Sequence, residues 1–248
     1  MPVEQHTLRH NGADLYAETH GPAAGPPVLL LHGGIGSAAD WAAQIPALVA
    51  AGRRVVAVDC RARGRSTWGD APLTFEVMTA DTLAVLGALG IAQADLVGWS
   101  DGAIIGLEMA IRHRARLRKL VLYGGLARAD RSVPEPVMTP GFEAAYARLA
   151  ADQARLSPQP ERLQEAEQAL FALYAIAPNF PDDELRGITT PTLVLDGAEE
   201  ELILPGEPER MAALIPGSQL VIMPGTGHFA PFEQPDEFNR ILLAFLAA

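Results

Sequence analysis

The sequence has only one cysteine, Cys60, in 248 residues. A single cysteine excludes an intrachain disulfide and is typical of a reducing compartment, so we expect a cytoplasmic protein. Basic residues are also few, because 19 Lys and Arg stand against 30 Asp and Glu, for a formal net charge of −11. An acidic surface repels phosphate groups, so nucleic acid is not an expected partner.

Long apolar runs are missing as well. No stretch approaches the roughly 18–20 residues that a bilayer-spanning helix needs, so we expect no membrane association. The first residues, MPVEQH, lack the basic and apolar segments of a secretory signal. No His, Cys, Asp or Glu residues cluster at the spacing of metal ligands, so no metal is expected. Oligomeric state cannot be predicted from these features.

Short apolar runs alternate with helical patterns along most of the chain. The runs typical of buried strands lie at 27–31, 54–58, 94–97, 120–123, 191–195 and 220–223. The helical patterns lie at 38–51, 75–89, 103–114, 207–214 and 235–246. This alternation predicts a mostly parallel sheet covered by helices on both faces. Two further stretches around Asn11 and Gly12 predict an N-terminal β-hairpin.

One interval, residues 125–190, is far longer than a crossover connection requires. It opens with a proline-rich loop and continues with two amphipathic segments, 142–156 and 161–174. We interpret it as a small helical cap. The predicted division is a core of residues 1–125 and 186–248 with an inserted cap of residues 126–185.

The segment 98–102 (GWSDG) is the most informative motif. It follows an apolar strand-like run and precedes a helical one, which is the context in which G-x-S-x-G indicates a nucleophile elbow. The tight turn exposes the hydroxyl of Ser100 and requires glycine at positions 98 and 102. A helix N-terminus at this point also directs backbone N–H groups at developing negative charge.

A general base and an acid should follow the serine in the chain. His113 lies in a basic helix end, whereas His228 lies in a glycine-rich loop after a buried strand, so His228 is the candidate base. The acid is expected in the loop after the strand 191–195, where three consecutive glutamates stand. Spacing from Gly197 favours Glu200, and Asp130 is the alternative.

The loop 32–37 (HGGIGS) follows another predicted strand at the same edge of the sheet. A backbone N–H of this loop, with that of Asp101, is suited to an oxyanion. The loop lacks the lysine of a P-loop and the spacing of a dinucleotide fingerprint, so no cofactor is expected. His32 is expected to bond loop backbone, and Cys60 to be a small buried hydrophobic residue.

With these motifs the chain resembles an α/β-hydrolase over nearly its whole length. The motifs occur in the order 32–34, 59–66, 98–102, 197–203 and 227–228. The GWSDG elbow is similar to that of small bacterial esterases and lactonases and of biphenyl-hydrolase-like amino-acid-ester hydrolases. The resemblance implies an α/β-hydrolase fold and a catalytic triad of Ser100, His228 and Glu200. It also implies oxyanion donors at the backbones of Gly34 and Asp101.

The chain departs from this family in two places. The acid is usually Asp, and Glu200 is one methylene longer. The usual Arg-Gly-His-Gly is Arg-Ala-Arg-Gly at 61–64, a loop whose role is mostly structural. Both departures have to be compensated by the local loop geometry.

Several residues are candidates for binding substrate. Asp101 is expected either to cap the helix that follows it or, by the resemblance, to bind a substrate ammonium group. Aromatic and methionine side chains are candidates for an apolar acyl pocket or for plain packing: Trp41, Trp68, Trp99, Met138, Phe142, Tyr146, Phe171 and Tyr174.

The sequence therefore favours a cofactor-free serine hydrolase of a small carboxylic ester or lactone, acting through an acyl-enzyme. A C–C bond hydrolase, a perhydrolase or an amidase on the same triad is an alternative. A non-catalytic ligand receptor on the same fold is a further one, because fold alone does not establish function. Dehalogenase and epoxide hydrolase chemistry are disfavoured, since they call for a carboxylate at position 100.

Overall fold

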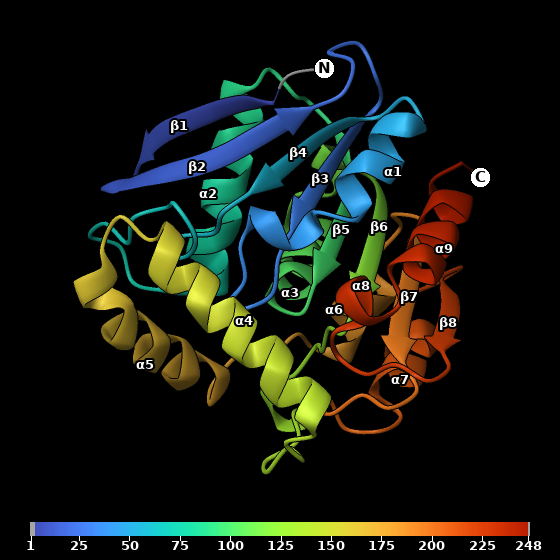
Figure 1. Ribbon diagram of the computed structural model, residues 1–248. Helices are drawn as coiled ribbons and strands as arrows, with labels where there is room; N and C mark the ends of the chain where they lie inside the picture. The colour runs from blue at the N-terminus through green and yellow to red at the C-terminus, as the bar shows by residue number, and fades with distance from the viewer. Residues whose placement is uncertain (1–2, 248) are drawn as a thin grey trace.

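The computed structural model describes residues 3–247, which contain one eight-stranded sheet between layers of helices (Figure 1). The strand order is β1-β2-β4-β3-β5-β6-β7-β8. The strands are β1 (Glu4–His10), β2 (Ala13–His20), β3 (Pro27–Leu31), β4 (Arg54–Val58), β5 (Ala94–Trp99), β6 (Leu117–Tyr123), β7 (Thr192–Gly197) and β8 (Gln219–Met223). The predicted hairpin is present, because β1 and β2 pair antiparallel around a turn at Asn11 and Gly12.

From β4 to β8 in this order every neighbouring pair of strands is parallel, and β2 alone among the eight described strands runs against this direction, because it pairs antiparallel with both β1 and β4. The carboxyl ends of the parallel strands therefore meet at one edge of the sheet. The predicted mostly parallel sheet is confirmed. The basic segment around His113 is divided among three elements, because a helix ends at Arg112, Arg114–Arg116 form a 3-10 turn and β6 begins at Leu117.

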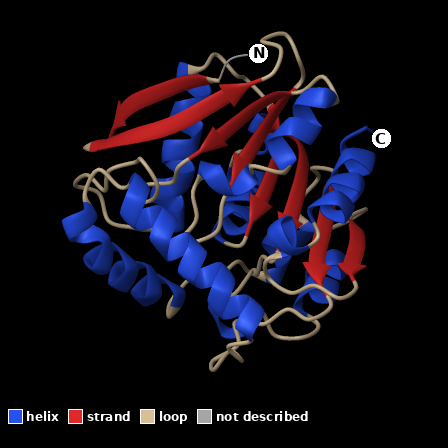
Figure 2. Cartoon of the chain, in the orientation of Figure 1, coloured by secondary structure: helices blue, strands red, loops and turns tan. Residues whose placement is uncertain are grey.

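Helices cover both faces of the sheet (Figure 2). One face carries α1 (Gln44–Ala50) and α9 (Pro235–Ala247), and the other carries α2 (Phe75–Ala88), α3 (Asp101–Arg112) and α7 (Glu207–Leu214). Side chains of each inner strand alternate between the two cores. In β3, Leu29 and Leu31 join the core under α2 and α3, whereas Val28 and Leu30 join the core under α1 and α9. This two-sided burial explains the continuous apolar runs of the sequence.

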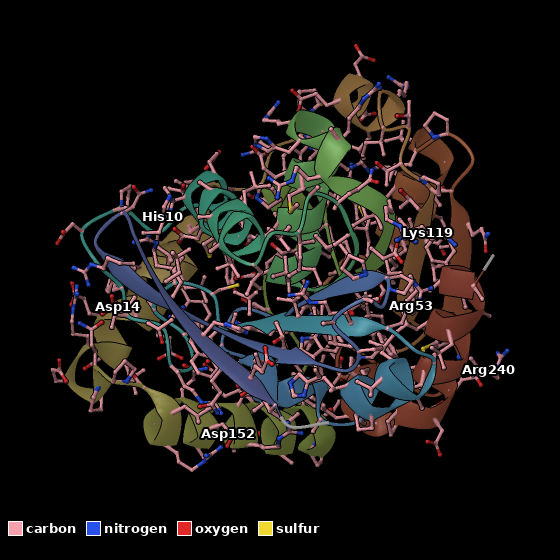
Figure 3. All side chains as sticks on the ribbon, turned by 90° about the horizontal axis from the view of Figure 1, so that it is seen from above. His10, Asp14, Arg53, Lys119, Asp152 and Arg240 are labelled. Carbon is pink, nitrogen blue, oxygen red and sulfur yellow. The ribbon has the colours of Figure 1, made fainter. Side chains whose placement is uncertain are left out.

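The C-terminal helix is tied to the sheet by two basic side chains. Arg53 donates to the Leu246 carbonyl at 2.6 Å, and Lys119 donates to the Phe245 carbonyl at 2.8 Å. Figure 3 shows both basic residues on the side of the sheet nearest this helix. Cations at a helix C-terminus satisfy the last carbonyl groups and offset the helix dipole.

The residues between β6 and β7 form α4 (Pro140–Leu156), α5 (Leu163–Tyr174) and α6 (Asp182–Arg186), and a short α8 (Ala230–Glu233) precedes α9. In Figure 1, α4 and α5 lie across the carboxyl ends of the strands, where the site must be. None of the helices within residues 3–247 combines the length and apolarity that a bilayer crossing requires.

Candidate active site

Ser100 stands in the sharp turn between β5 and α3. Its φ of 55° and ψ of −114° lie in a region that residues other than glycine rarely adopt, so the backbone is strained here. A Cβ on Gly98 would overlap the Gly102 carbonyl group, and a Cβ on Gly102 would overlap that of Leu31. The Ser100 N–H donates to the Tyr123 carbonyl at 2.8 Å. The two glycines therefore permit the turn, and the strand β6 fixes it.

The loop after β3 lies beside this turn. The Gly102 N–H donates to the His32 carbonyl at 3.1 Å, which ties the loop to α3. The Arg63 guanidinium donates through Nε to the Gly34 carbonyl from the other side. Within residues 3–247 neither the Gly34 N–H nor the Asp101 N–H has a protein acceptor. Two free N–H groups beside the serine make a suitable oxyanion hole.

His32 is a structural residue, as the sequence predicts. Its Nε2 accepts the Cys60 N–H at 2.9 Å, so its Nδ1 carries the proton and donates to the Gly33 carbonyl at 2.6 Å. Burial lowers the pKa of His32 to about 4, so the ring is neutral. Cys60 is buried, and burial raises the pKa of its thiol, so it stays protonated.

His228 and Glu200 come together as the sequence predicts. Both carboxylate oxygens of Glu200 lie 2.9 Å from Nδ1 of His228, and Oε1 also accepts the Leu202 N–H at 2.7 Å. The side chains are 4% and 9% exposed, so water hardly screens the pair. The longer glutamate is thus accommodated by a loop that donates a backbone N–H to it.

The contact between Glu200 and His228 shifts the pKa of each group. Burial opposes the charged form of each group, but their mutual attraction and hydrogen bonds outweigh it. As a result the pKa of Glu200 lies below its ordinary value and the pKa of His228 lies above its ordinary value. Glu200 therefore fixes the Nδ1–H tautomer, which leaves the lone pair of Nε2 free to accept a proton.

Other side chains hold the backbone of the histidine loop. Trp99 Nε1 donates to the His228 carbonyl at 2.8 Å. The His228 N–H donates to Glu201 at 2.9 Å, and the Gly227 N–H donates to Glu233 at 3.1 Å. No sequence motif marks these two carboxylates, of which Glu201 lies in the loop that follows β7 and Glu233 lies in α8. Each carboxylate accepts a hydrogen bond from a backbone N–H and so holds the loop that carries His228.

Asp196 is a buried acid that no sequence motif marks. It lies near the end of β7, is 1% exposed, and accepts the Gly197 N–H at 2.8 Å. An acidic residue that ends an otherwise apolar strand was the signal available in the sequence. The alternative triad acid, Asp130, is exposed and pairs with Arg128 at 2.7 Å. The structure brings Glu200, and not Asp130, to the histidine.

Ser100, Asp101 and His228 line one cavity of about 610 Å³ between the sheet edge and α4 and α5. Within residues 3–247 the Ser100 hydroxyl makes no hydrogen bond to His228. In unliganded sites this bond is often long and closes only around substrate. The shared cavity thus brings the hydroxyl, the imidazole and the two free N–H groups to one reaction space.

Six of the eight candidate pocket residues line this cavity: Trp99, Met138, Phe142, Tyr146, Phe171 and Tyr174. The other two do not, because Trp41 is packed in the core beside Phe238 and Trp68 lies under Arg162. Most of the remaining lining is aliphatic or proline, including Leu149, Leu170 and Pro178 of the cap. The cavity is therefore mainly apolar.

Among the described residues that line the cavity, Asp101 is the one that carries a carboxylate. It is buried, and Tyr174 hydrogen-bonds to it while Arg63 and His228 attract it. Burial outweighs these partners and raises the pKa of Asp101 to about 6. Tyr174 also packs over Gly34, where a Cβ would overlap its hydroxyl. Within residues 3–247 no group of metal-ligating side chains is placed to bind an ion.

Comparison with known proteins agrees with this geometry. The sequence profile of the Alpha/beta hydrolase family matches residues 28–241. The chain belongs to this family. Its relatives include a protein of Variovorax paradoxus (strain S110) named as a proposed carbamate hydrolase, RutD, which is 32% identical over 94% of this chain and 96% of that protein.

Two solved structures share the fold over almost the whole chain. A hydrolase from Pseudomonas aeruginosa is 27% identical, with a TM-score of 0.79 over 98% of both chains. The enol-lactonase from Burkholderia xenovorans LB400 is 26% identical, with a TM-score of 0.78 over 98% of this chain and 100% of that chain. The α/β-hydrolase fold and a hydrolytic function are thus established for this protein.

Proposed function

We propose that the protein is a serine hydrolase that cleaves a small carboxylic ester or lactone without a negative charge through Ser100, His228 and Glu200. The observation that carries this proposal is the His228–Glu200 pair, with both oxygens 2.9 Å from Nδ1, in a cavity that also contains the strained serine. A buried acid–imidazole pair of this kind activates a hydroxyl nucleophile.

The reaction begins when His228 Nε2 accepts the proton of Ser100 as Oγ attacks the carbonyl carbon. The N–H groups of Gly34 and Asp101 stabilise the oxyanion. The tetrahedral intermediate collapses when imidazolium donates the proton to the leaving oxygen, which leaves an acyl-enzyme. Water then attacks the acyl group with His228 again as the base, and the carboxylic acid is released. In a lactone the leaving oxygen remains attached to the acyl chain.

The cavity lining supports a mainly apolar substrate that carries no negative charge. No Lys or Arg lines the cavity within the described part of the chain. The neighbouring Arg63 already donates hydrogen bonds to the carbonyls of Gly34, Ala62 and Ala166. A substrate carboxylate would find no cation there and would face Asp101, so its desolvation would be uncompensated. Anionic esters should be poor substrates.

Asp101 has two possible roles in this proposal. As the first residue of α3 it is favourably placed near the positive end of the helix dipole. Its carboxylate also forms part of the cavity wall, so a substrate ammonium group could pair with it there. In that case Asp101→Ala lowers kcat/KM for amine-bearing esters more than for neutral esters. Equal losses would assign it to the helix alone.

A panel of p-nitrophenyl esters tests the proposal. We expect hydrolysis of neutral acetate and butyrate esters, and roughly 100-fold lower kcat/KM for an ester of matched length that ends in a carboxylate. A p-nitrophenyl carbamate belongs in the panel because a relative is named as a carbamate hydrolase. Absence of both a burst and turnover with every member would contradict the proposal and favour a ligand receptor.

A further inference from the structure

The buried acid Asp196 stands at the site without a place in the reaction described above. Its Oδ1 accepts the Gly197 N–H at 2.8 Å, whereas its Oδ2 is shielded from solvent and has no donor within residues 3–247. No cation lies within salt-bridge distance of it in the same residues. An ionised carboxylate in such a setting is strongly destabilising, because neither water nor a counter-charge compensates it.

The acidic neighbour of this unpartnered side-chain oxygen is Glu200, whose charge raises the pKa of Asp196. A hydrogen bond between two carboxyl groups requires that one of them carries a proton. Glu200 has donors that stabilise its negative charge, namely the Leu202 N–H at 2.7 Å and His228 Nδ1 at 2.9 Å. Asp196 has only the N–H of Gly197. The proton therefore belongs on Asp196.

The groups that face the pair agree with this assignment. Glu209 of α7 faces Asp196, Glu201 of the acid loop faces Glu200, and the Tyr123 hydroxyl of β6 lies near both carboxyl groups. All three groups are acidic or neutral, and the basic side chain that contacts this pair, His228, contacts it through Glu200. Burial and the charge of Glu200 raise the pKa of Asp196 well above its ordinary value.

We infer that Asp196 is a positioning residue which, in its protonated form, donates a hydrogen bond to Glu200 and holds the triad acid against His228. This inference rests on the proposed triad. It also accounts for the glutamate at this position. The extra methylene gives Glu200 an additional torsion, and three donors from different segments restrict it: Asp196, the Leu202 N–H and His228.

Two substitutions separate a protonated Asp196 from an ionised one. Asp196→Asn keeps the shape, the acceptor for Gly197 and a donor toward Glu200, so we expect kcat within about threefold of wild type. Asp196→Ala removes the donor, so we expect kcat on p-nitrophenyl butyrate to fall roughly 10- to 100-fold with little change in KM. Asp95→Asn is the control. Asp95 is a buried acid near the start of β5, at the end of that strand away from Ser100, so this substitution should change thermal stability but not kcat.

The pKa of His228, measured by NMR titration, gives a readout that does not depend on turnover. When Glu200 loses a hydrogen-bond donor, its negative charge is less stabilised and attracts the protonated His228 more strongly. Asp196→Ala should therefore raise the pKa of His228, and Asp196→Asn, which keeps a donor, should leave that pKa unchanged. If Asp196 is ionised, either substitution removes a negative charge and lowers that pKa, which would overturn the inference. Unchanged values and unchanged kcat in both variants would also overturn it.

A second background tests whether Asp196 acts through Glu200. In Glu200→Ala, the further change Asp196→Ala should have little additional effect on kcat, because the group that it positions is gone. Full additivity would contradict the inference. Should Asp196→Ala fail to fold, the titration of Asp196→Asn alone still decides between the two protonation states. If the wild type proves inactive on all esters, the proposed function fails while the NMR test of this pair remains valid.

Discussion

The two halves of the site are held in different ways. The nucleophile half, between β3 and β5, is fixed by backbone contacts that leave no room for a side chain at Gly98 or Gly102. The base half, beyond β7 and β8, is fixed by carboxyl groups that contact His228 and its loop, with Glu200 and Glu201 as the direct partners. Close backbone packing therefore holds the nucleophile half in place, and hydrogen bonds to charged carboxylates hold the base half.

This difference predicts how each half fails. A substitution in the nucleophile half should damage the fold and the activity together, because the strained turn is part of the main-chain packing. A substitution in the base half should change activity and its pH dependence while the fold persists, because an isosteric group can fill the same volume. The following predictions test this contrast.

The largest effect on activity is expected from Glu200→Gln. The amide fills the same space but lacks the charge that stabilises imidazolium and fixes its tautomer, so kcat should fall by roughly 10³- to 10⁴-fold. The melting temperature should change little. Glu199→Gln, an exposed neighbour in the same loop, is the matched control and should keep full activity. A Glu200→Gln enzyme with near wild-type kcat would remove Glu200 from the triad.

Gly102→Ala should lower both activity and stability. The added methyl group would overlap the Leu31 carbonyl, so the elbow must shift and kcat/KM should fall at least about 100-fold. Unfolding should become easier by about 1–3 kcal/mol. Gly87→Ala in α2 is the control, because its added methyl group meets nothing within 4 Å and a helical alanine is favoured. Equal behaviour of the two variants in thermal melts would contradict the contrast.

The pH dependence should report the base half. His228 must be neutral to accept a proton, and the buried Glu200 pair raises its pKa above 6.5. Activity should therefore rise with pH through a midpoint above 6.5. In Glu200→Gln the attraction is lost while burial remains, so the midpoint of the residual activity should move down. A profile of kcat/KM against pH that is flat between 5 and 8 would contradict a histidine base.

The last and smallest prediction concerns the pH dependence of stability at Asp101. Burial raises its pKa from 3.8 to about 6, so its ionisation opposes folding above pH 6 and this cost fades as the pH falls below 6. Asp101→Asn should therefore stabilise the protein at pH 8 by about 1–3 kcal/mol, and by less at pH 5. Thermal melts at both pH values measure this difference. A destabilised variant at pH 8 would mean that the carboxylate is better compensated than its burial suggests.

Much of the fold was predictable because each inner strand is buried on both faces and reads as an apolar run. The elbow was predictable because its glycines occur in a strand–turn–helix context. The positions of His228 and Glu200 followed from chain order and from spacing to Gly197. These are local patterns, so a single sequence can carry them.

The remaining features depend on contacts between distant segments. The Trp99 indole holds the carbonyl of His228, which is 129 positions away in the chain. Aromatic spacing could not separate Trp41, which enters the core, from Phe142, which enters the cavity. Asp196 looked like the polar end of a strand, because its role depends on where the next loop places Glu200. Tertiary packing decides these roles, and local pattern does not encode them.

The most direct measurement of the central claim is peptide mapping after reaction with a fluorophosphonate, which traps an activated serine as a covalent adduct. The wild-type protein should carry one adduct, on the peptide that contains Ser100, and Ser100→Ala should carry none. Glu200→Gln should react far more slowly at the same serine. Labelling at another residue, or no labelling of the folded wild-type protein, would contradict the assignment of Ser100 as the nucleophile.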